Sequence, residues 1–348
     1  MDILIQSIRI IERERNEVIR RDTPETFSDY IKKVVRYLYD NTAVRDYETR
    51  STNNEVIRTI LDIIQNKDND DYVENKVDSI AKRLLAEEIK AQNAVSSMSV
   101  VMQKGSLIQT LLFDPDSNRY AYLLAKVEHT DFIDVSDFSS RTGFSKDTKK
   151  IWKTCVFMID DVNDDVFGAQ VYSDTAAKFW HDGFLELNPI NTDEANTVNA
   201  FRAIEVELSK VKKASPRDYL LLRNATVVYF RTHGRFDYQD YLKSTIQNYQ
   251  PEELSQEKME NLITRFNELP RNKNFDYQFN TITSKISARI KKVYSVTNGV
   301  ELRITDGISN LNETIQAYTD DDGNNYLKIK TDDQNVFNTF SKKENITN

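Results

Sequence analysis

The side chains most able to do chemistry in this sequence are lysines and arginines that gather in three short stretches. Cationic side chains placed this close together are the groups that bind the phosphates of a polyanion. The aromatic residues Phe144 and Trp152 lie within the first stretch, where they could stack on an exposed base or pack into a core. The candidate phosphate-binding residues are Arg141, Lys146, Lys149, Lys150 and Lys153, then Lys210, Lys212, Lys213 and Arg217, and finally Lys285, Arg289 and Lys292.

The third stretch has the spacing of a helix, which we expect near residues 282–293. Lys285, Arg289 and Lys292 follow one another at i, i+4 and i+7, so they share one side of that helix. The three residues that directly follow them are apolar and form a second stripe, about 100° round the helix. Such a helix could bury its apolar side and present cations to DNA, although an ordinary solvated helix has the same pattern.

The three histidines and the single cysteine form no recognisable catalytic or metal-binding motif. His129, His181 and His233 are too far apart in the sequence for a metal-ligand spacing such as His-x3-His. The sequence contains no Gly-x-Ser-x-Gly elbow, phosphate-binding loop or dinucleotide-binding loop. Cys155 lies in an apolar run, which is typical of a buried thiol. We therefore expect a non-catalytic protein without a metal or cofactor.

Acidic clusters offer a weaker indication of metal binding. Asp114, Asp116 and Asn118 have the one-three-five spacing of a calcium loop, but Arg119 stands where that loop needs glycine, and Ala125 stands where it needs glutamate. This cluster and the acidic stretches 160–165 and 320–323 are better interpreted as turns. A magnesium-dependent nuclease stays open as an alternative, because acidic residues and a lysine can converge from distant parts of a chain.

Composition and charge limit the class of protein. With 348 residues, of which 39% are hydrophobic, the chain can form about two domains with real cores. A formal net charge of −8 excludes indiscriminate coating of nucleic acid, so contact with DNA requires local basic surface or a partner. The sequence contains neither a secretory signal pattern nor the roughly 18 consecutive apolar residues of a membrane-spanning helix. We therefore expect a cytoplasmic protein.

The order of predicted elements indicates an α+β fold with a domain over residues 1–172, a second over 173–340 and a flexible tail over 341–348. In the first domain we expect an opening strand near 1–11, a helix from Thr23 and another around 73–89. A central antiparallel sheet should follow, with strands at 107–113, 120–127, 153–159 and 166–172. The second of those helices is expected to turn Lys76, Lys82, Arg83, Glu87 and Glu88 toward solvent.

The second domain returns to helical patterns and closes with strands. We expect helices at 176–184, 193–211, 238–247 and 255–267, followed by the basic helix near 282–293. Ser215-Pro216 suggests a helix end. Strands are expected at 300–304, 314–318 and 326–330, the last two joined in a hairpin.

Several of these segments, taken together, resemble the bacterial nucleoid-associated NdpA family, the 37-kDa class. They are residues 1–11, the helix 27–39, the hairpin strands 105–113 and 120–129, the segment 176–185 and the closing strands from 299–304 to 326–330. Trp180-His181-Asp182 stands where the family has a shorter aromatic-Leu-Asp run, so the chain resembles a divergent member. The resemblance implies nucleoid association and DNA binding, and it brings no catalytic residues.

We therefore expect a homodimeric, nucleoid-associated protein that touches the phosphate backbone of DNA and reads few bases directly. The alternative is a protein-interaction or phage-defence subunit that acts through a partner protein, because an acidic surface suits basic partners. Neither hypothesis involves a membrane.

Overall fold

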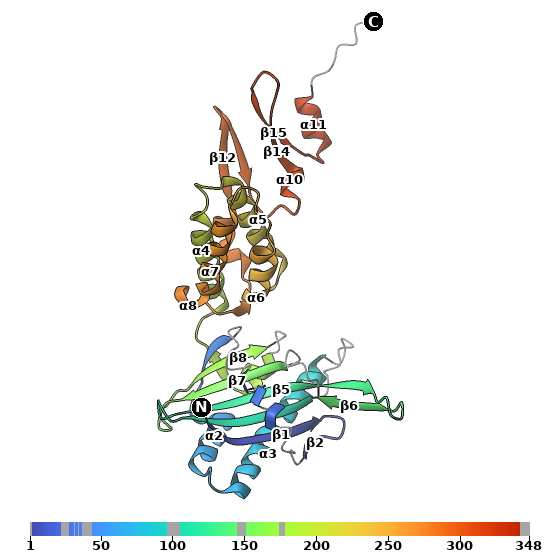
Figure 1. Cartoon of the computed structure of the whole chain (residues 1–348), viewed down its shortest axis with the longest axis vertical. Coiled ribbons are helices and arrows are strands. Elements are labelled where there is room, and N and C mark those ends of the chain that lie inside the picture. Colours follow the sequence, from blue (N-terminus) through green and yellow to red (C-terminus); the bar gives the residue numbers. More distant parts are fainter. Residues whose placement is uncertain are drawn as a thin grey trace. The chain divides into compact units, whose positions relative to one another are not determined.

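The computed structural model describes residues 2–21, 28–30, 32–33, 35–36, 44–95, 105–144, 151–173 and 178–341. It confirms the expected α+β class. The chain forms two compact units (Figure 1): unit 1 comprises Met1–Thr192 and Asp276–Phe279, and unit 2 comprises Asp193–Phe275 and Asn280–Asn348. Among the described residues, no helix is both long enough and apolar enough to cross a membrane.

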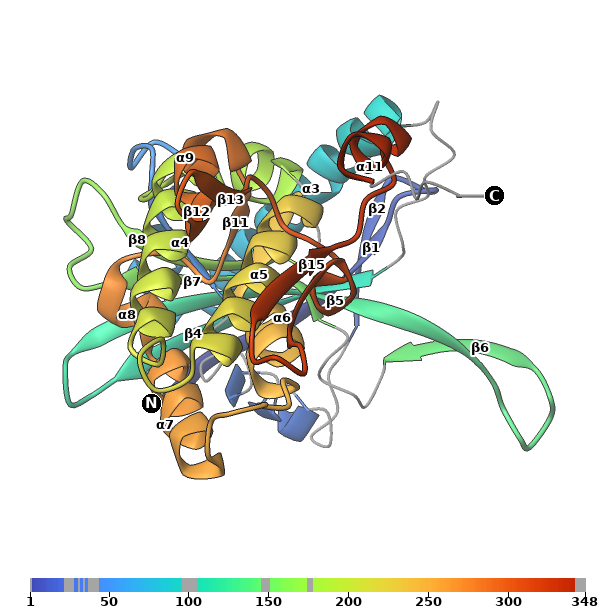
Figure 2. The ribbon, with the colours of Figure 1, turned by 90° about the horizontal axis from the view of Figure 1, so that it is seen from above.

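Unit 1 is built on a nine-stranded antiparallel sheet. Its main path runs β2-β1-β4-β5-β7-β8-β3-β9, and β6 pairs with the far end of β5. Figure 2 shows the β5–β6 hairpin extending beyond the rest of the sheet. The strands are β1 (Asp2–Glu12), β2 (Glu17–Arg20), β3 (Arg45–Thr49), β4 (Gly105–Asp114), β5 (Arg119–Ile133), β6 (Ser140–Phe144), β7 (Ile151–Ile159), β8 (Gly168–Ser173) and β9 (Leu187–Pro189).

The predicted central hairpin is confirmed. β4 and β5 pair in register from Gly105 opposite Glu128 to Asp114 opposite Arg119. At the turn the Asp114 carboxylate accepts hydrogen bonds from Ser117 Oγ and from the backbone N–H of Asp116. These bonds lower the pKa of Asp114, with the Ser117 bond as the main cause. The calcium-like spacing therefore belongs to a hairpin turn.

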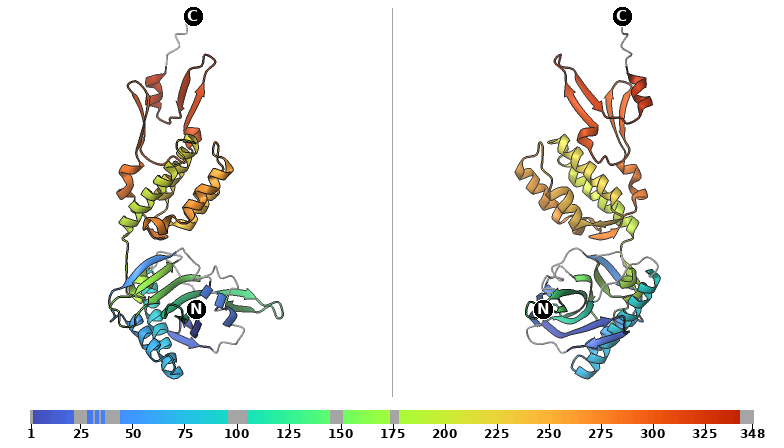
Figure 3. Two further views of the ribbon diagram at one scale, coloured as in Figure 1. Left: turned by 60° about the vertical axis from the view of Figure 1, so that its left-hand side comes forward. Right: turned by 90° about the vertical axis from the view of Figure 1, so that its right-hand side faces the viewer.

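Two helices, α2 (Glu55–Gln65) and α3 (Asp70–Val95), cover one face of this sheet (Figure 3). The predicted apolar stripe of α3 is confirmed, because Val77, Ile80 and Leu84 are fully buried in a core shared with β4, β5 and β7. The expectation that Glu88 faces solvent is wrong: its side chain is 1% exposed and pairs with the equally buried Lys126. Glu88 lies on the sheet-facing side of the helix, where the lysine supplies its counter-charge.

The segment that follows β8 belongs to unit 1. A short π-helix, η3 (Phe179–Phe184), buries Trp180 and Phe184 in the unit 1 core, and β9 pairs with β3. The helix predicted at 176–184 is thus found from residue 179, and residues 174–177 lie outside the described part of the chain. Because η3 and β9 complete this core, the units divide at Thr192, later than the expected boundary at 172 and 173.

Unit 2 is mostly helical at its centre. The predicted end of a helix at Ser215-Pro216 is wrong, since Ser215 precedes a helix that has Pro216 in its first turn, where the missing N–H of proline costs nothing. Its helices are α4 (Asp193–Ser209), α5 (Pro216–Thr232), α6 (Tyr238–Tyr241), η4 (Leu242–Gln247), α7 (Gln256–Asn267), α8 (Leu269–Lys273), η5 (Thr283–Ile286), α9 (Ser287–Ile290), α10 (Leu311–Thr314) and α11 (Gln334–Phe340). A short strand, β10 (Arg235–Asp237), completes the centre, and two residues of β11 (Gln278–Asn280) belong to unit 1.

The basic helix predicted near 282–293 is shorter than expected. Ile286 and Ile290 are buried as predicted, but the helix ends at Ile290 and Val293 is 52% exposed. Lys292 begins β12 (Lys292–Thr297), which pairs with β13 (Val300–Ile304). From Lys292 onward the backbone pairs with β13. Val293, the third apolar residue of the predicted stripe, therefore lies on a strand and not on a helix.

A second hairpin, β14 (Ile315–Thr319) and β15 (Asn325–Ile329), confirms the predicted closing strands. The segment between the two hairpins is fastened to α5. Asn224 exchanges hydrogen bonds with the backbone of Ile308, and Arg231 pairs with Asp306 at 2.9 Å. Gly307 lies so close to α5 that a Cβ there would meet the backbone nitrogen of Val228 at 3.0 Å. The base of each hairpin is therefore held on α5.

Candidate nucleic-acid interface

In the first predicted basic group, neither of the two cations that the structure describes is both exposed and unpaired. Lys146, Lys149 and Lys150 lie outside them, as do the side chains of Phe144 and Trp152. Arg141 is exposed but pairs with Asp134 at 3.1 Å and Asp137 at 2.7 Å at the tip of the β5–β6 hairpin. Lys153 is 6% exposed, and its ammonium lies 5.7 Å from the centre of the Phe179 ring. Burial and pairing therefore remove both described cations from this group.

The second group divides into paired and unpaired cations. Lys210 pairs with Glu207 at 2.6 Å, and Arg217 pairs with Glu252 at 3.2 Å. Lys212 and Lys213 are exposed in the turn between α4 and α5, and the ammonium of Lys212 lies 5.5 Å from the centre of the Tyr219 ring. Only these two lysines stay available to an external anion.

The third group is mostly exposed. Lys285 on η5 and Arg289 on α9 are exposed, and Lys292 at the start of β12 is half-buried. Lys291, which the helical spacing left out, is exposed between them. In the sequence, only its position beside Lys292 indicates that Lys291 belongs with this group. Within the described part of the chain we find no carboxylate paired with any of these four cations.

A buried arginine fixes the third group on the helices of unit 2. Arg223 of α5 pairs with Glu205 of α4 at 2.9 Å. It also donates hydrogen bonds to the carbonyl oxygens of Arg289 at 2.7 Å and Ile290 at 3.2 Å. These carbonyls are left unsatisfied where α9 ends, so Arg223 caps that helix. The backbone that carries Arg289 and Lys291 is thus tied to both α4 and α5.

Tyr219 of α5 lies beside a cation of the second group. The ammonium of Lys212 lies over its ring, and burial raises the pKa of its hydroxyl. We call the six exposed or half-exposed cations of the second and third groups the unit 2 cation group: Lys212, Lys213, Lys285, Arg289, Lys291 and Lys292.

The distribution of charge favours a cationic surface in unit 2. Residues 1–192 contain 25 Lys and Arg against 33 Asp and Glu, whereas residues 193–348 contain 22 of each. The net charge of −8 therefore lies in the first part of the chain. The unit 2 cation group comes from two stretches, 208–217 and 277–300, and neither contains a carboxylate side chain. These cations therefore have no carboxylate among their nearest neighbours in the sequence.

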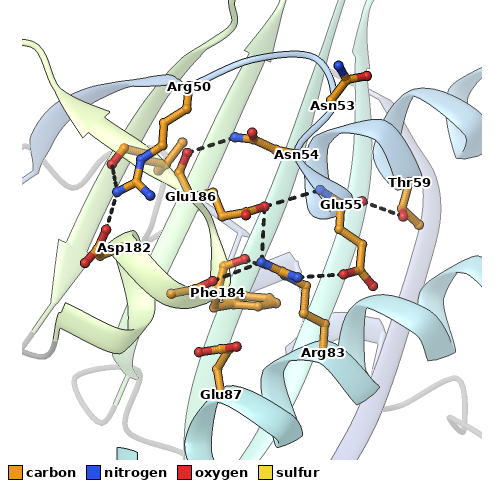
Figure 4. A network of polar contacts seen from close by, with 12 residues as sticks. Arg50, Asn53, Asn54, Glu55, Thr59, Arg83, Glu87, Asp182, Phe184 and Glu186 are labelled. Carbon is orange, nitrogen blue, oxygen red and sulfur yellow. Dashed lines mark hydrogen bonds and ion pairs between the residues drawn. The ribbon is translucent and has the colours of Figure 1, made fainter. Parts of the chain in front are cut away.

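Some cations of unit 1 are held in internal ion pairs, as the network in Figure 4 illustrates. Arg83 of α3, predicted to face solvent, is largely buried and pairs with Glu55 at 2.6 Å and Glu186 at 3.1 Å. It also donates hydrogen bonds to the carbonyl oxygens of Gly183 and Phe184, each at 3.0 Å. In the same network Arg50 pairs with Asp182. These contacts fasten the end of η3 to α2 and α3, and they leave little of Arg83 for an external ligand.

The three histidines contact neighbouring side chains, and the cysteine is buried. His129 Nε2 lies 2.8 Å from Ser106 Oγ, and burial lowers the pKa of this histidine. His233 stacks on Tyr229 with the ring centres 4.0 Å apart, and His181 lies against Tyr47. Cys155 is buried as expected, which raises the pKa of its thiol. In the part of the chain that the structure describes, no three His, Cys, Asp or Glu side chains are grouped to hold a metal ion.

Comparison with known proteins adds no family to this picture. The chain matches no protein-family model and no curated protein.

Proposed function

We propose that this chain is a DNA-binding protein that holds the phosphate backbone through the unit 2 cation group. The observation that carries the proposal is a group of cations close in sequence: Lys285, Arg289 and Lys291 are exposed, have no carboxylate partner among the described residues, and come from a stretch, 277–300, without a carboxylate side chain. Exposed cations without a carboxylate partner among the described residues also occur in unit 1, at Arg58 and Lys82, but the first part of the chain has an excess of carboxylates. Exposed cations of this kind bind phosphates by releasing condensed counterions. The excess of carboxylates in unit 1 limits DNA to unit 2.

The contact is electrostatic, so its strength depends on salt. If all six cations of the group met phosphates, affinity for duplex DNA would fall about a thousandfold between 50 and 200 mM salt. Backbone contacts of this kind carry no sequence information, and little sequence preference is expected. The nucleoid-associated setting that we propose with this function rests on the resemblance to the NdpA family. The cytoplasmic setting rests on the sequence patterns, and the homodimer is part of the same proposal.

The proposal is tested with the full-length chain and a fluorescent duplex of mixed sequence. The double variant Lys285→Glu/Arg289→Glu should weaken binding and reduce the slope of log affinity against log salt by about two. A matched control is Lys258→Glu, because Lys258 is also exposed but lies on α7 between Glu257 and Glu260. Equal losses in the double variant and the control, or no loss in either, would remove the proposed surface.

One observation favours a second function, that of a protein-interaction subunit. The β5–β6 hairpin carries Val135, which is 87% exposed, and Phe138, which is 81% exposed, beside the carboxylates of Asp134 and Asp137. An apolar, acidic tip of this kind suits a basic protein partner better than DNA. Co-purification with a defined neighbour that is lost in Val135→Ser/Phe138→Ser, together with no DNA binding at low salt, would favour this function.

A further inference from the structure

A hollow of about 830 Å³ lies between the start of α5 and the β14–β15 hairpin (both labelled in Figure 1). Its volume is in the range of pockets that take small organic ligands. Arg217 lies on the helix side, and Asn312 of α10 joins it. The hairpin side is formed by Ile315, Gln316, Ala317, Tyr318 and Lys328.

The register of the hairpin explains which side chains lie on the same face as Tyr318. Tyr318 pairs with Tyr326 and Gln316 pairs with Lys328, so these four side chains lie on one face. The two tyrosine rings are stacked, with their centres 5.1 Å apart and their planes 15° apart. Tyr318 is 52% exposed, and its ring thus offers a flat apolar area to a further planar group.

Polar groups line the hollow at the base of the hairpin, two residues before Tyr318. Arg217 is held in place by Glu252 at 3.2 Å and by the side-chain oxygen of Asn312. The side-chain nitrogen of Gln316 donates a hydrogen bond to the backbone carbonyl of Asn312 at 3.2 Å. Two carboxamides and two cations, those of Arg217 and Lys328, therefore line the hollow together with Tyr318, and Glu252 engages both Arg217 and the side-chain nitrogen of Asn312.

The opposite end of the hairpin has the opposite charge. Its turn contains Asp320, Asp321 and Asp322 in succession. The carboxylate of Asp320 accepts hydrogen bonds from the backbone N–H of Asn324 and of Asp322, and the Asn324 bond is the main cause of its lowered pKa. An anionic ligand is consequently repelled from the tip and attracted toward Lys328 at the base, whereas Arg217 is paired with Glu252.

We propose that this hollow binds one unpaired nucleotide of single-stranded DNA. The base stacks on Tyr318, the side-chain oxygen of Gln316 reaches the base edge, and Lys328 contacts the adjoining phosphate. A base inside a duplex already stacks on its neighbours and cannot occupy the ring. The inference rests on the proposed function, to which it adds a preference for unpaired ends or single strands.

The test compares the full-length chain with its variants on fluorescent oligothymidylate and on duplex DNA. Tyr318→Ala should weaken binding to the single strand about tenfold, since loss of one stacking ring costs about 1–3 kcal/mol. Binding to the duplex should stay within about twofold, because the unit 2 cation group is unchanged. Tyr318→Phe keeps the ring and should bind the single strand like the unchanged protein. Phe138→Ala removes an exposed aromatic ring from unit 1 and serves as the matched control.

The outcomes separate this inference from the proposed function. Loss of single-strand affinity in Tyr318→Ala, with recovery in Tyr318→Phe, supports the pocket even if the protein does not bind duplex DNA. If the protein binds duplex DNA and Tyr318→Ala leaves single-strand affinity unchanged, only the proposed pocket is overturned. Equal losses in Tyr318→Ala and Tyr318→Phe also overturn it, because stacking does not need the hydroxyl. Failure to bind either DNA overturns both proposals.

Discussion

Two cations of unit 1 and two of unit 2 occupy opposite environments. In unit 1, Arg9 and Lys126 are buried between the sheet and α3, and each pairs with carboxylates of that helix. In unit 2, Lys285 on η5 and Arg289 on α9 are exposed, while the neighbouring Ile286 and Ile290 are buried. A cation removed from water requires a partner of opposite charge, whereas an exposed cation is already hydrated and can exchange that water for a phosphate. Burial, more than sequence position, thus decides which cations are candidates for binding.

The largest expected effect tests the unit 1 side of this comparison. Burial lowers the pKa of Lys126, and Glu88 opposes that shift. Glu88→Ala would leave the ammonium buried without its main partner, although Arg13 lies 3.8 Å from the same carboxylate and would lose its contact too. We expect the free energy of unfolding in urea to fall by about 3–5 kcal/mol.

Its control replaces both members of the pair. Glu88→Leu/Lys126→Met removes the two charges together and keeps comparable side-chain volumes, so it should restore most of the loss. If Glu88→Ala costs less than about 1 kcal/mol, the buried cations of unit 1 do not depend on their carboxylates.

A second prediction concerns the buried acid of unit 2, which is stabilised without a cation. Asp218 accepts hydrogen bonds from Ser215, Tyr249 and the backbone N–H groups of residues 252–254. Although burial alone would raise its pKa, these bonds hold it well below the usual range. Asp218→Asn should lower the free energy of unfolding at pH 7 by about 3 kcal/mol, because charged acceptors are replaced by a neutral amide.

The pH dependence of that loss follows from the direction of the shift. A carboxyl whose pKa is lower in the folded state stabilises the fold above its unfolded value, about 3.9, and loses that contribution as the pH falls toward the folded value. The difference between the unchanged protein and Asp218→Asn should therefore shrink as urea titrations move from pH 7 to below pH 4. A difference that stays constant over this range would show that Asp218 acts through shape and not through charge.

Local patterns predicted much of the fold. The periodicity of α3 and the turn between β4 and β5 depend on neighbours in the sequence, which is why they could be predicted. Helix α5 was missed because its buried side carries Asp218, Arg223 and Thr226, which disguise the apolar stripe. Their partners are distant in sequence, so no local pattern indicates that these polar groups are buried.

The candidate site was predictable as a list of cations but not as a surface. The pairing of Arg141 with Asp137 follows a spacing of four residues and could have been anticipated. In contrast, Arg223 joins α4, α5 and α9 across more than sixty residues of sequence. Lys146, Lys149 and Lys150 lie outside the described residues, and their part in DNA binding stays a prediction.

The smallest expected effect completes the comparison from the unit 2 side. Lys285→Ala/Arg289→Ala removes two exposed cations without leaving a buried charge, so the free energy of unfolding should change by less than about 0.5 kcal/mol. DNA affinity measured on the same protein should nevertheless fall and become less dependent on salt, because two phosphate contacts are lost. A large loss of stability would place these side chains in the fold of unit 2 and make any change in DNA binding a consequence of unfolding. If the free energy of unfolding is unchanged and DNA affinity falls, the two side chains act through binding and not through the fold.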